Sequence, residues 1–437
     1  MTEPIRSSLR LGRGTIDVTL PRDTTVLTGR AMRALADAPT EVAAALREPI
    51  GCDPLRTIVQ RRRPGTVAIT ISDITRPVPN ELLLTALLAE LNAAGVRDEQ
   101  VVIIIATGMH RPSTAQERDI MLGKALQRRC EVIDHCADDA TSVTRICDDP
   151  PVSVNTRFLQ SDLRIVTGLI EPHFMAGYSG GRKGVCPGLV DLNTVQRFHG
   201  YRVMGDPRSV EGMLEGNPCH ELSVKIADIV GVDFLLNVAI THDRHLSGVY
   251  AGDLHAAFLA GVRDVADWAG AAIDEPFDLV VTCAGGFPLE QNVYQSVKGM
   301  VTALPALHEQ STLLIASACT EIGSPEYTAM MMRWQCDWRG FLHHIGAAEQ
   351  TEKDQWQYQM QTRVLERIGV ERLRLVNDGL SLDTQRKLAV TPVEGDGDAA
   401  ARLQRFVDDY VRRHPQARVA IIPEGPYTML TAALQPT

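Results

Sequence analysis

At 437 residues the chain is long for one hydrophobic core, so two domains of about 150–200 residues each are the natural expectation. Apolar residues make up 44% and charged residues 22%, as in an ordinary globular protein. The formal net charge of −10 argues against nucleic acid or an anionic membrane as the main partner, while a local basic pocket for a small anion remains compatible with it.

Cysteine usage and the N-terminal segment indicate a cytoplasmic protein. The nine cysteines are scattered and form no C-x-x-C pair, which is typical of reduced thiols rather than of a disulfide or zinc framework. The first twenty residues hold no apolar stretch of signal-peptide length, and apolar runs such as VVIIIA at 101–106 are strand-sized. We expect a cytoplasmic enzyme or binding protein that is a monomer or a small homo-oligomer.

Strand-like and helix-like segments alternate through the first half of the chain. The β-branched and apolar runs at 66–72, 101–108 and 163–170 predict strands, the last two nearly continuous in apolar residues, as in a strand buried on both faces. Residues 79–95 predict a helix with Asn80 as N-cap and Leu84, Leu87, Leu88 and Leu91 on one face. Residues 234–240 and 246–253 flank a short polar turn and predict a hairpin.

A second series of strands follows a polar break at EPFD (275–278). Strands are predicted at 279–286, 311–318, 372–378 and 418–425, with helical segments between them, including 292–309. Alternating strands and helices predict an α/β fold with mostly parallel sheets flanked by helices. We place the domain boundary near residue 274, which gives domains at 1–274 and 275–437.

Polar side chains stand directly after three predicted strands. Asp73 and Arg76 follow the first, His110 the second and His173 the third. Ligands of open α/β sheets collect at the carboxyl ends of the strands, so these groups are expected to converge at one edge. Each also has a structural interpretation, because Asp commonly caps turns and a lone His is more often a structural hydrogen-bonding residue than a catalyst. The coincidence of three favours a site.

The stretch EPHFMAGYSGGRKGVCPG (171–188) combines His173, five glycines and Lys183. Its glycines allow a backbone that turns N–H groups toward a phosphate, although an ordinary strand-to-helix turn with a surface lysine is equally compatible. It is not a Walker A motif, because Gly184 rather than Ser or Thr follows the lysine.

The second domain offers a helix on which Gln291, Gln295 and Lys298 share a face. That face is either solvated or an amide-bearing, cationic wall for a carboxylate. Other histidine pairs carry less weight as metal sites: His242 and His245 lie in a predicted hairpin turn, and the pair at 343–344 is treated in the same way.

Together these motifs resemble the nickel-pincer lactate racemase family. The resemblance is carried by D-x-T-R-P at 73–77, G-M-H-R-P at 108–112 and PHFMAGYSGGRKGVCPG at 172–188, with His199 and the Gln295/Lys298 pair following in matching order. It implies two α/β domains with the active site in the cleft between them. It also implies a nickel pincer nucleotide, a pyridinium-3,5-bisthiocarboxylic acid mononucleotide that binds nickel, made by cofactor-biosynthesis proteins.

The resemblance also implies a role for each matching residue. Lys183 would hold the cofactor through a thioamide, and His199 would be a nickel ligand. His110 and His173 would be the acid/base pair. The remaining matches fall into three groups: cofactor and substrate lining by Asp73, Thr75 and Arg76, phosphate binding by Ser179, Gly180 and Gly181, and substrate carboxylate binding by Gln295 and Lys298.

The implied activity is racemisation or epimerisation at C2 of a small 2-hydroxy acid. The α-proton of such an acid is very weakly acidic, so hydride transfer to the cofactor, with a histidine removing the hydroxyl proton, avoids a carbanion and passes through a 2-keto acid. Alternatives are a larger substrate, such as a sugar acid or an aromatic hydroxy acid, and a non-catalytic nucleotide-binding protein. An NAD-dependent dehydrogenase is disfavoured because no G-x-G-x-x-G follows a strand.

Overall fold

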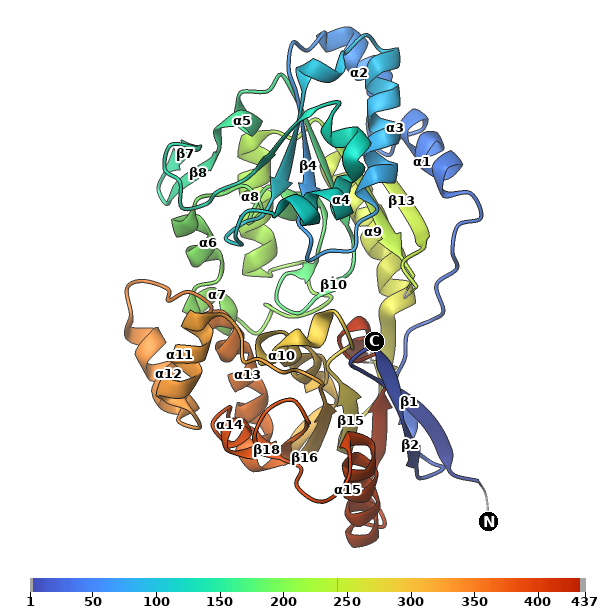
Figure 1. The fold of residues 1–437 in the computed structure, drawn as a ribbon, viewed down its shortest axis with the longest axis vertical. Coiled ribbons are helices and arrows are strands. Elements are labelled where there is room, and N and C mark those ends of the chain that lie inside the picture. The colour runs from blue at the N-terminus through green and yellow to red at the C-terminus, as the bar shows by residue number, and fades with distance from the viewer. Residues whose placement is uncertain (1–2, 242, 433–437) are drawn as a thin grey trace. The chain divides into compact units, whose positions relative to one another are not determined.

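The computed structural model describes residues 3–241 and 243–432, which form two compact units. The histidine unit contains the described residues of Ala31–His199 and Arg208–Trp268. The companion unit contains the described residues of Met1–Arg30, Gly200–Pro207 and Ala269–Thr437. Each unit is a sheet covered by helices (Figure 1), so the predicted α/β class is confirmed.

A six-stranded sheet in the order β13-β12-β9-β4-β5-β6 forms the centre of the histidine unit. All neighbouring pairs are parallel except β12 and β13, the predicted hairpin. The unit's strands are β4 (Val67–Ser72), β5 (Val101–Ala106), β6 (Glu131–Asp134), β7 (Val143–Asp148), β8 (Pro151–Asn155), β9 (Leu163–Leu169), β10 (Pro172–His173), β11 (Gly177–Tyr178), β12 (Phe234–Ile240) and β13 (Leu246–Gly252). The strands predicted at 66–72, 101–108 and 163–170 are thus confirmed as β4, β5 and β9.

The helices of this unit bury apolar side chains, the first four of them in one core cluster with this sheet. They are α1 (Ala38–Arg47), α2 (Leu55–Arg62), α3 (Asn80–Ala93), α4 (Ala115–Gln127), α5 (Thr156–Leu159), α6 (Leu192–Phe198), α8 (Pro218–Val230) and α9 (Leu254–Ala269). The four leucines predicted to share a face of α3 are all fully buried. The predicted N-cap is wrong by one residue: Pro79 holds that position without a side-chain hydrogen bond, and Asn80 is buried in the first turn.

The companion unit is built on a second six-stranded sheet, in the order β18-β17-β16-β15-β19-β3, with every pair parallel. Its strands are β1 (Ile5–Leu11), β2 (Gly14–Leu20), β3 (Thr25–Val26), β14 (Gly270–Ile273), β15 (Phe277–Cys283), β16 (Leu307–Ala316), β17 (Leu373–Val376), β18 (Thr391–Pro392), β19 (Val419–Ile422) and β20 (Met429–Ala432). The four strands predicted for this half correspond to β15, β16, β17 and β19.

Seven α-helices are described in the companion unit: α7 (Tyr201–Gly205), α10 (Val293–Thr302), α11 (Pro325–Trp334), α12 (Trp338–Ala347), α13 (Gln355–Ile368), α14 (Leu382–Arg386) and α15 (Ala399–Arg413). The helix predicted over 292–309 ends early, at Thr302, and β16 already begins at Leu307. Pro305 explains the difference, because proline cannot continue the hydrogen-bond ladder of a helix.

The compact units differ from the single boundary predicted near residue 274. The chain passes between units at 268/269, but residues 3–30 and 200–207 also belong to the companion unit. Two contacts hold residues 3–30 there: β3 pairs with β19, and the β1–β2 hairpin lies beside α15 and β15 (Figure 1). A segment that pairs with a strand almost 400 residues away gives no local signal of where it packs.

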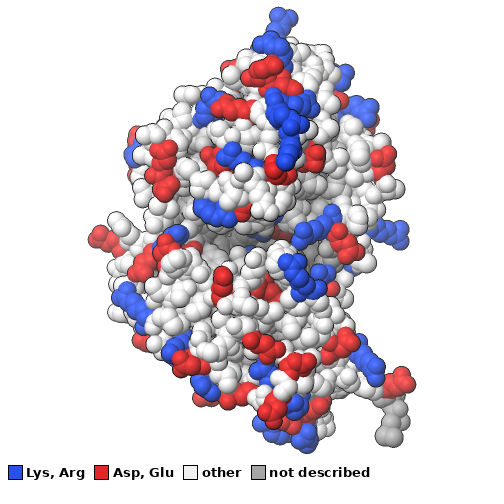
Figure 2. Space-filling model, viewed as in Figure 1, with Lys and Arg blue, Asp and Glu red and all other residues white. Residues whose placement is uncertain are grey.

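The face of the molecule shown in Figure 2 has no dominant charge of one sign. Acidic and basic side chains are interspersed on it. Among the described helices, none has both the length and the apolar character needed to cross a bilayer.

Candidate active site

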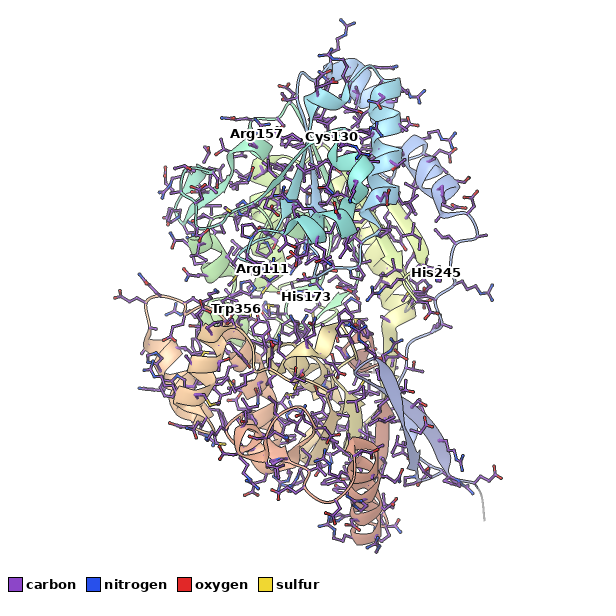
Figure 3. The ribbon with its side chains drawn as sticks, viewed as in Figure 1. Arg111, Cys130, Arg157, His173, His245 and Trp356 are labelled. Atoms are coloured by element: carbon purple, nitrogen blue, oxygen red, sulfur yellow. The ribbon has the colours of Figure 1, made fainter. Side chains whose placement is uncertain are left out.

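Three loops of the histidine unit meet at the carboxyl edge of its sheet. They follow β4, β5 and β9, which are adjacent and parallel in the order β9-β4-β5. The backbone N–H of Gly108, after β5, donates to the carbonyl of Gly188 at 3.0 Å, which ties the second loop to the glycine-rich stretch. Figure 3 shows Arg111 and His173, one from each of these loops, near the same end of the unit.

Asp73 and His110 form a hydrogen-bonded pair across two of these loops. His110 Nδ1 lies 2.6 Å from Asp73 Oδ2, and the hydroxyl of Thr75 donates to Asp73 Oδ1 at 2.5 Å. Burial raises the pKa of the Asp73 carboxyl, but the hydrogen bonds and charge of His110, with Thr75 and Arg76, outweigh it and leave that pKa lowered. An ionised Asp73 accepts the Nδ1 proton, so His110 presents the lone pair of Nε2, and its side chain is 57% exposed.

Arg76 links the first loop to the third. Its guanidinium donates to Glu171 Oε1 at 2.6 Å, and both side chains are about one-quarter to one-third exposed (30% and 25%). Sequence reasoning missed Glu171 as a site residue, although it directly precedes Pro172-His173 in the glycine-rich stretch. The pair leaves the remaining guanidinium donors of Arg76 able to hold an anion.

His173 has the opposite hydrogen-bond polarity to His110. Its Nδ1 accepts from the backbone N–H groups of Met175 and Ala176, at 3.4 and 3.2 Å. In a neutral imidazole the proton is therefore on Nε2. That nitrogen lies 3.2 Å from Nζ of Lys183. The two predicted catalytic histidines thus present different groups: His110 a lone pair, His173 an N–H.

Lys183 lies partly buried between an aromatic ring and a histidine. Its Nζ is 5.4 Å from the centroid of the Phe198 ring and also contacts His173. Burial lowers the pKa of Lys183 to about 7, and the positive charges of Arg182 and Arg76 act in the same direction. A lysine with this pKa is partly a free amine at neutral pH, which makes it a nucleophile.

His199, at the C-terminus of α6, has one nitrogen oriented by the backbone. Its Nδ1 donates to the carbonyl of Val195 at 2.9 Å, so its Nε2 carries the lone pair. Burial lowers the pKa of His199 to about 3, and the charges of Lys183 and His110 add to this effect. A neutral imidazole whose second nitrogen donates to a carbonyl is the usual form of a histidine metal ligand.

The glycine turn uses several of its polar groups within the protein. The hydroxyl of Ser179 donates to Leu169 and accepts from the N–H of Glu171, and the Ser179 N–H donates to the Glu171 carbonyl. The N–H of Gly181 donates to Asn237 Oδ1 at 2.6 Å. Gly180 has φ +78°, and a side chain there would meet Asn237. Phosphate binding by Ser179, Gly180 and Gly181 stays a prediction. Asn237 supports this turn, and sequence reasoning missed it.

Arg182 braces the same turn from inside the unit. Its side chain is only 1% exposed and donates to the carbonyls of Ala176 and Gly180 while its guanidinium lies over the Phe258 ring. No carboxylate of the described residues pairs with it, and burial lowers the pKa of Arg182 to about 9. Its charge and that of Arg76 make this part of the unit suited to an anionic ligand.

The remaining predicted substrate residues belong to the companion unit. Gln295 and Lys298 lie one turn apart on α10, both partly buried, and Gln295 Oε1 is buried without a hydrogen-bond partner among the described residues. On the same helix the hydroxyl of Tyr294 accepts from Trp356 Nε1 at 2.9 Å, whereas Trp338 is a core residue. Carboxylate binding by Gln295 and Lys298 stays a prediction.

No conventional metal cluster accompanies these residues. Among the described residues, no three or more His, Cys, Asp or Glu side chains group so as to hold a metal ion. His245 is exposed, and His242, its partner in the disfavoured metal interpretation, lies outside the described residues. A metal bound by His199 would therefore take its other ligands from a non-protein group.

A parallel sheet whose carboxyl edge carries an Asp–His pair, a second histidine and a lysine of lowered pKa is the arrangement of an α/β enzyme. The family models specify which one: residues 11–212 match the lactate racemase N-terminal domain and residues 273–429 the lactate racemase C-terminal domain. The chain belongs to the lactate racemase family and is an isomerase.

Similar proteins agree over nearly the whole chain. The lactate racemase of Thermoanaerobacterium thermosaccharolyticum is 30% identical over 88% of this chain and 88% of its own length. That of Lactiplantibacillus plantarum is 30% identical over 88% and 89%, respectively. The lactate racemase apoprotein structure from T. thermosaccharolyticum superimposes with a TM-score of 0.87, at 27% identity, over 98% of this chain and all of that one. A Thermotoga maritima protein, TM-score 0.66 at 16% identity over 90% of this chain and 98% of its own, shares the fold.

Proposed function

We propose that this isomerase inverts C2 of a small 2-hydroxy acid, with lactate as the first candidate and His110 and His173 as its acid/base pair. One observation carries the proposal: two histidines of opposite hydrogen-bond polarity lie in the loops after β5 and β9, on either side of β4 at one sheet edge, where His110 contacts Asp73 and His173 contacts Lys183. Cofactor binding alone would not require an oriented Asp–His pair, which argues against a carrier protein.

The residues of the chain would manage protons and charge while the α-hydrogen moves. In one direction His110 Nε2 takes the hydroxyl proton, and Asp73 stabilises the imidazolium that forms. His173, on its own loop, presents Nε2–H and would return a proton to the same oxygen when the opposite configuration forms. The two histidines exchange these roles in the reverse direction. The guanidinium of Arg76, fixed by Glu171, attracts the substrate carboxylate and keeps the planar 2-keto acid bound. Gln295 and Lys298 are proposed as further carboxylate ligands.

The residues also fit the nickel pincer nucleotide that the family resemblance implies. Lys183 offers a partly neutral amine for the covalent bond, His199 offers a lone pair on an oriented nitrogen, and the cationic surroundings suit an anionic nucleotide. When bound, the nucleotide would supply the hydride acceptor. The proposed partners are therefore the proteins that make this cofactor, and the proposed location is the cytoplasm.

Stereochemistry and isotope retention test the activity. The loaded enzyme is given single enantiomers of lactate, an aromatic 2-hydroxy acid and a sugar acid, each deuterated at C2, and products are separated on a chiral column. We expect inversion with deuterium largely retained for one class. Complete exchange of the label with solvent would indicate α-proton abstraction instead of hydride transfer. The absence of inversion for all three substrates would refute the proposed function.

Two variants test the cofactor assignment separately. His199→Ala is expected to lose nickel, from about one per chain, while keeping the circular dichroism spectrum of the parent. Lys183→Ala is expected to lose the covalent cofactor adduct in intact-protein mass spectrometry. Unchanged nickel in the first variant, or an adduct of the same mass in the second, would assign the ligand or the anchor to another residue.

A further inference from the structure

The contact between His173 and Lys183 indicates the protonation state of the lysine. His173 Nδ1 is an acceptor for two backbone N–H groups, so the neutral ring carries its proton on Nε2. Nε2 lies 3.2 Å from Lys183 Nζ, within hydrogen-bond distance. An N–H at that distance needs a lone pair opposite it. An ammonium has none, whereas a neutral amine has one.

The surroundings of Lys183 favour the same form. The aromatic ring of Phe198 lies on one side, and Arg182, whose guanidinium is buried, directly precedes Lys183 in the chain. Besides His173, the charged or titratable groups that act on Lys183 from several elements are Arg76, Arg182, Cys186, Cys219 and His199. None of them is a carboxylate that would hold an ammonium in place.

We propose that His173 has a second role that precedes catalysis: its hydrogen bond holds Lys183 as a free amine, positioned to form the bond to the incoming nucleotide. This inference rests on the proposed function, because it assumes that Lys183 is the anchor. It assigns to one histidine two successive tasks, first toward the lysine and then toward the substrate. His110, bonded to Asp73, takes no part in the first.

The bond-forming step balances without an oxidant or a reductant. Nζ of Lys183 adds to the carbon of a thiocarboxylate, a C–N bond forms, the C–O bond breaks, and the sulfur stays as the thioamide. The oxygen leaves as water, with one proton from the amine and one from solvent. The hydrogen bond from His173 breaks as the amine lone pair forms the C–N bond, and the His173 Nε2–H can then donate to a substrate oxygen.

Two substitutions of His173 separate its two nitrogens. Asn at this position places Oδ1 near the site of Nδ1 and can keep the hydrogen bonds from Met175 and Ala176, but it lacks the Nε2 group. Gln can instead place an amide N–H near Nε2. His173→Asn therefore tests the contact with the lysine while preserving the turn, and His173→Gln is the conservative rescue.

The first experiment uses the cofactor-free protein. Acetic anhydride at limiting concentration acylates Lys183, and peptide mass spectrometry follows the rate. We expect His173→Asn to slow acylation of Lys183 by about tenfold or more, His173→Gln to recover most of the rate, and His245→Ala, at an exposed histidine of the same unit, to match the parent. Equal rates for the parent and His173→Asn, with unchanged circular dichroism, would overturn the inference.

The second experiment follows loading itself. The same proteins are produced together with the cofactor-biosynthesis proteins, and the fraction carrying the adduct is measured over time by intact mass. We expect His245→Ala to load like the parent and His173→Asn to load at least about tenfold more slowly. Acylation of Lys183 could depend on His173 as expected while the parent, after loading, carries no adduct. In that case the anchor assignment in the proposed function fails and the hydrogen-bond role of His173 stands.

Discussion

The carboxyl edges of the two six-stranded sheets carry different kinds of polar groups. In the histidine unit, side chains after adjacent strands pair in ways that leave chemistry accessible: His110 keeps an exposed Nε2 while Asp73 binds its other nitrogen, and Arg76 pairs with a partly exposed Glu171. The polar groups here titrate or carry charge, and the pKa of Asp73 is lowered by His110, Thr75 and Arg76 despite its burial.

At the edge of the companion-unit sheet the polar groups are buried and paired with one another. Asn377, after β17, donates to the carbonyls of Ser317 and Cys319, and the Ser317 hydroxyl bonds that of Ser296 at 2.9 Å. Glu290 is 2% exposed and accepts from the N–H of Gly12, so it fastens the turn of the N-terminal hairpin.

The comparison shows that one architecture uses its sheet edge in two ways. A strand end whose side chains satisfy each other and exclude water stabilises the fold. A strand end whose side chains keep an exposed donor or acceptor can act on a ligand. This difference predicts that substitutions at the edge of the histidine-unit sheet change turnover. Substitutions at the edge of the companion-unit sheet are predicted to change stability.

The largest effect is expected from the histidines. His110→Ala should lower 2-hydroxy acid inversion per loaded enzyme by at least about 10²-fold in both directions, because each complete turnover uses both bases. Chiral product analysis measures the rate, and thermal unfolding should change little. His245→Ala, at an exposed histidine of the same unit, is the matched control. Equal rates for the two variants would remove His110 from the mechanism.

A smaller loss of rate is expected from Asp73→Asn, about tenfold or more, since an amide can orient Nδ1 but cannot stabilise the imidazolium. Stability should also respond to pH. The pKa of Asp73 is lowered in the folded state, so its ionised form stabilises the fold above the unfolded value of about 3.9. That stability is lost as pH falls through the folded pKa. The difference in free energy of unfolding between the parent and Asp73→Asn should therefore vanish in acid. A constant difference would contradict this.

The companion-unit edge should behave in the opposite way. Asn377→Ala leaves two buried carbonyls without a donor and should lower the free energy of unfolding by about 2 kcal/mol. Urea denaturation followed by tryptophan fluorescence measures it, with Asn92→Ala, at an exposed asparagine, as the control. The inversion rate per folded enzyme should stay within about twofold of the parent. A large loss of rate without loss of stability would make this edge catalytic.

The smallest effect is expected from Glu290→Gln. Burial raises the pKa of Glu290, so the folded state favours its protonated form, and its contribution to stability is greatest at low pH and declines as pH rises through the folded pKa. The amide stays neutral and can still accept from Gly12. We expect a melting temperature equal to or slightly above that of the parent at pH 7, with the difference vanishing near pH 4. A lower value at pH 7 would show that the charge is needed.

Local pattern was sufficient for most of the architecture. Continuous apolar runs predicted β4, β5 and β9 because strands buried on both faces need apolar side chains throughout. The polar residues directly after those runs followed from the same argument, since parallel strands present their carboxyl ends at one edge. The sequence by itself thus determined the fold class and the order in which Asp73, His110 and His173 enter the site.

Only the tertiary structure decided how those residues are used. The partner of Arg76 is 95 residues away, and the carboxylate of Asp73 orients a histidine 37 residues away, so no periodicity could reveal either pairing. The opposite polarity of His110 and His173 depends on which neighbours donate to each Nδ1. The placement of the first 30 residues likewise depends on pairing with β19. Local sequence reports whether a side chain is buried, whereas its chemistry depends on partners brought together by folding.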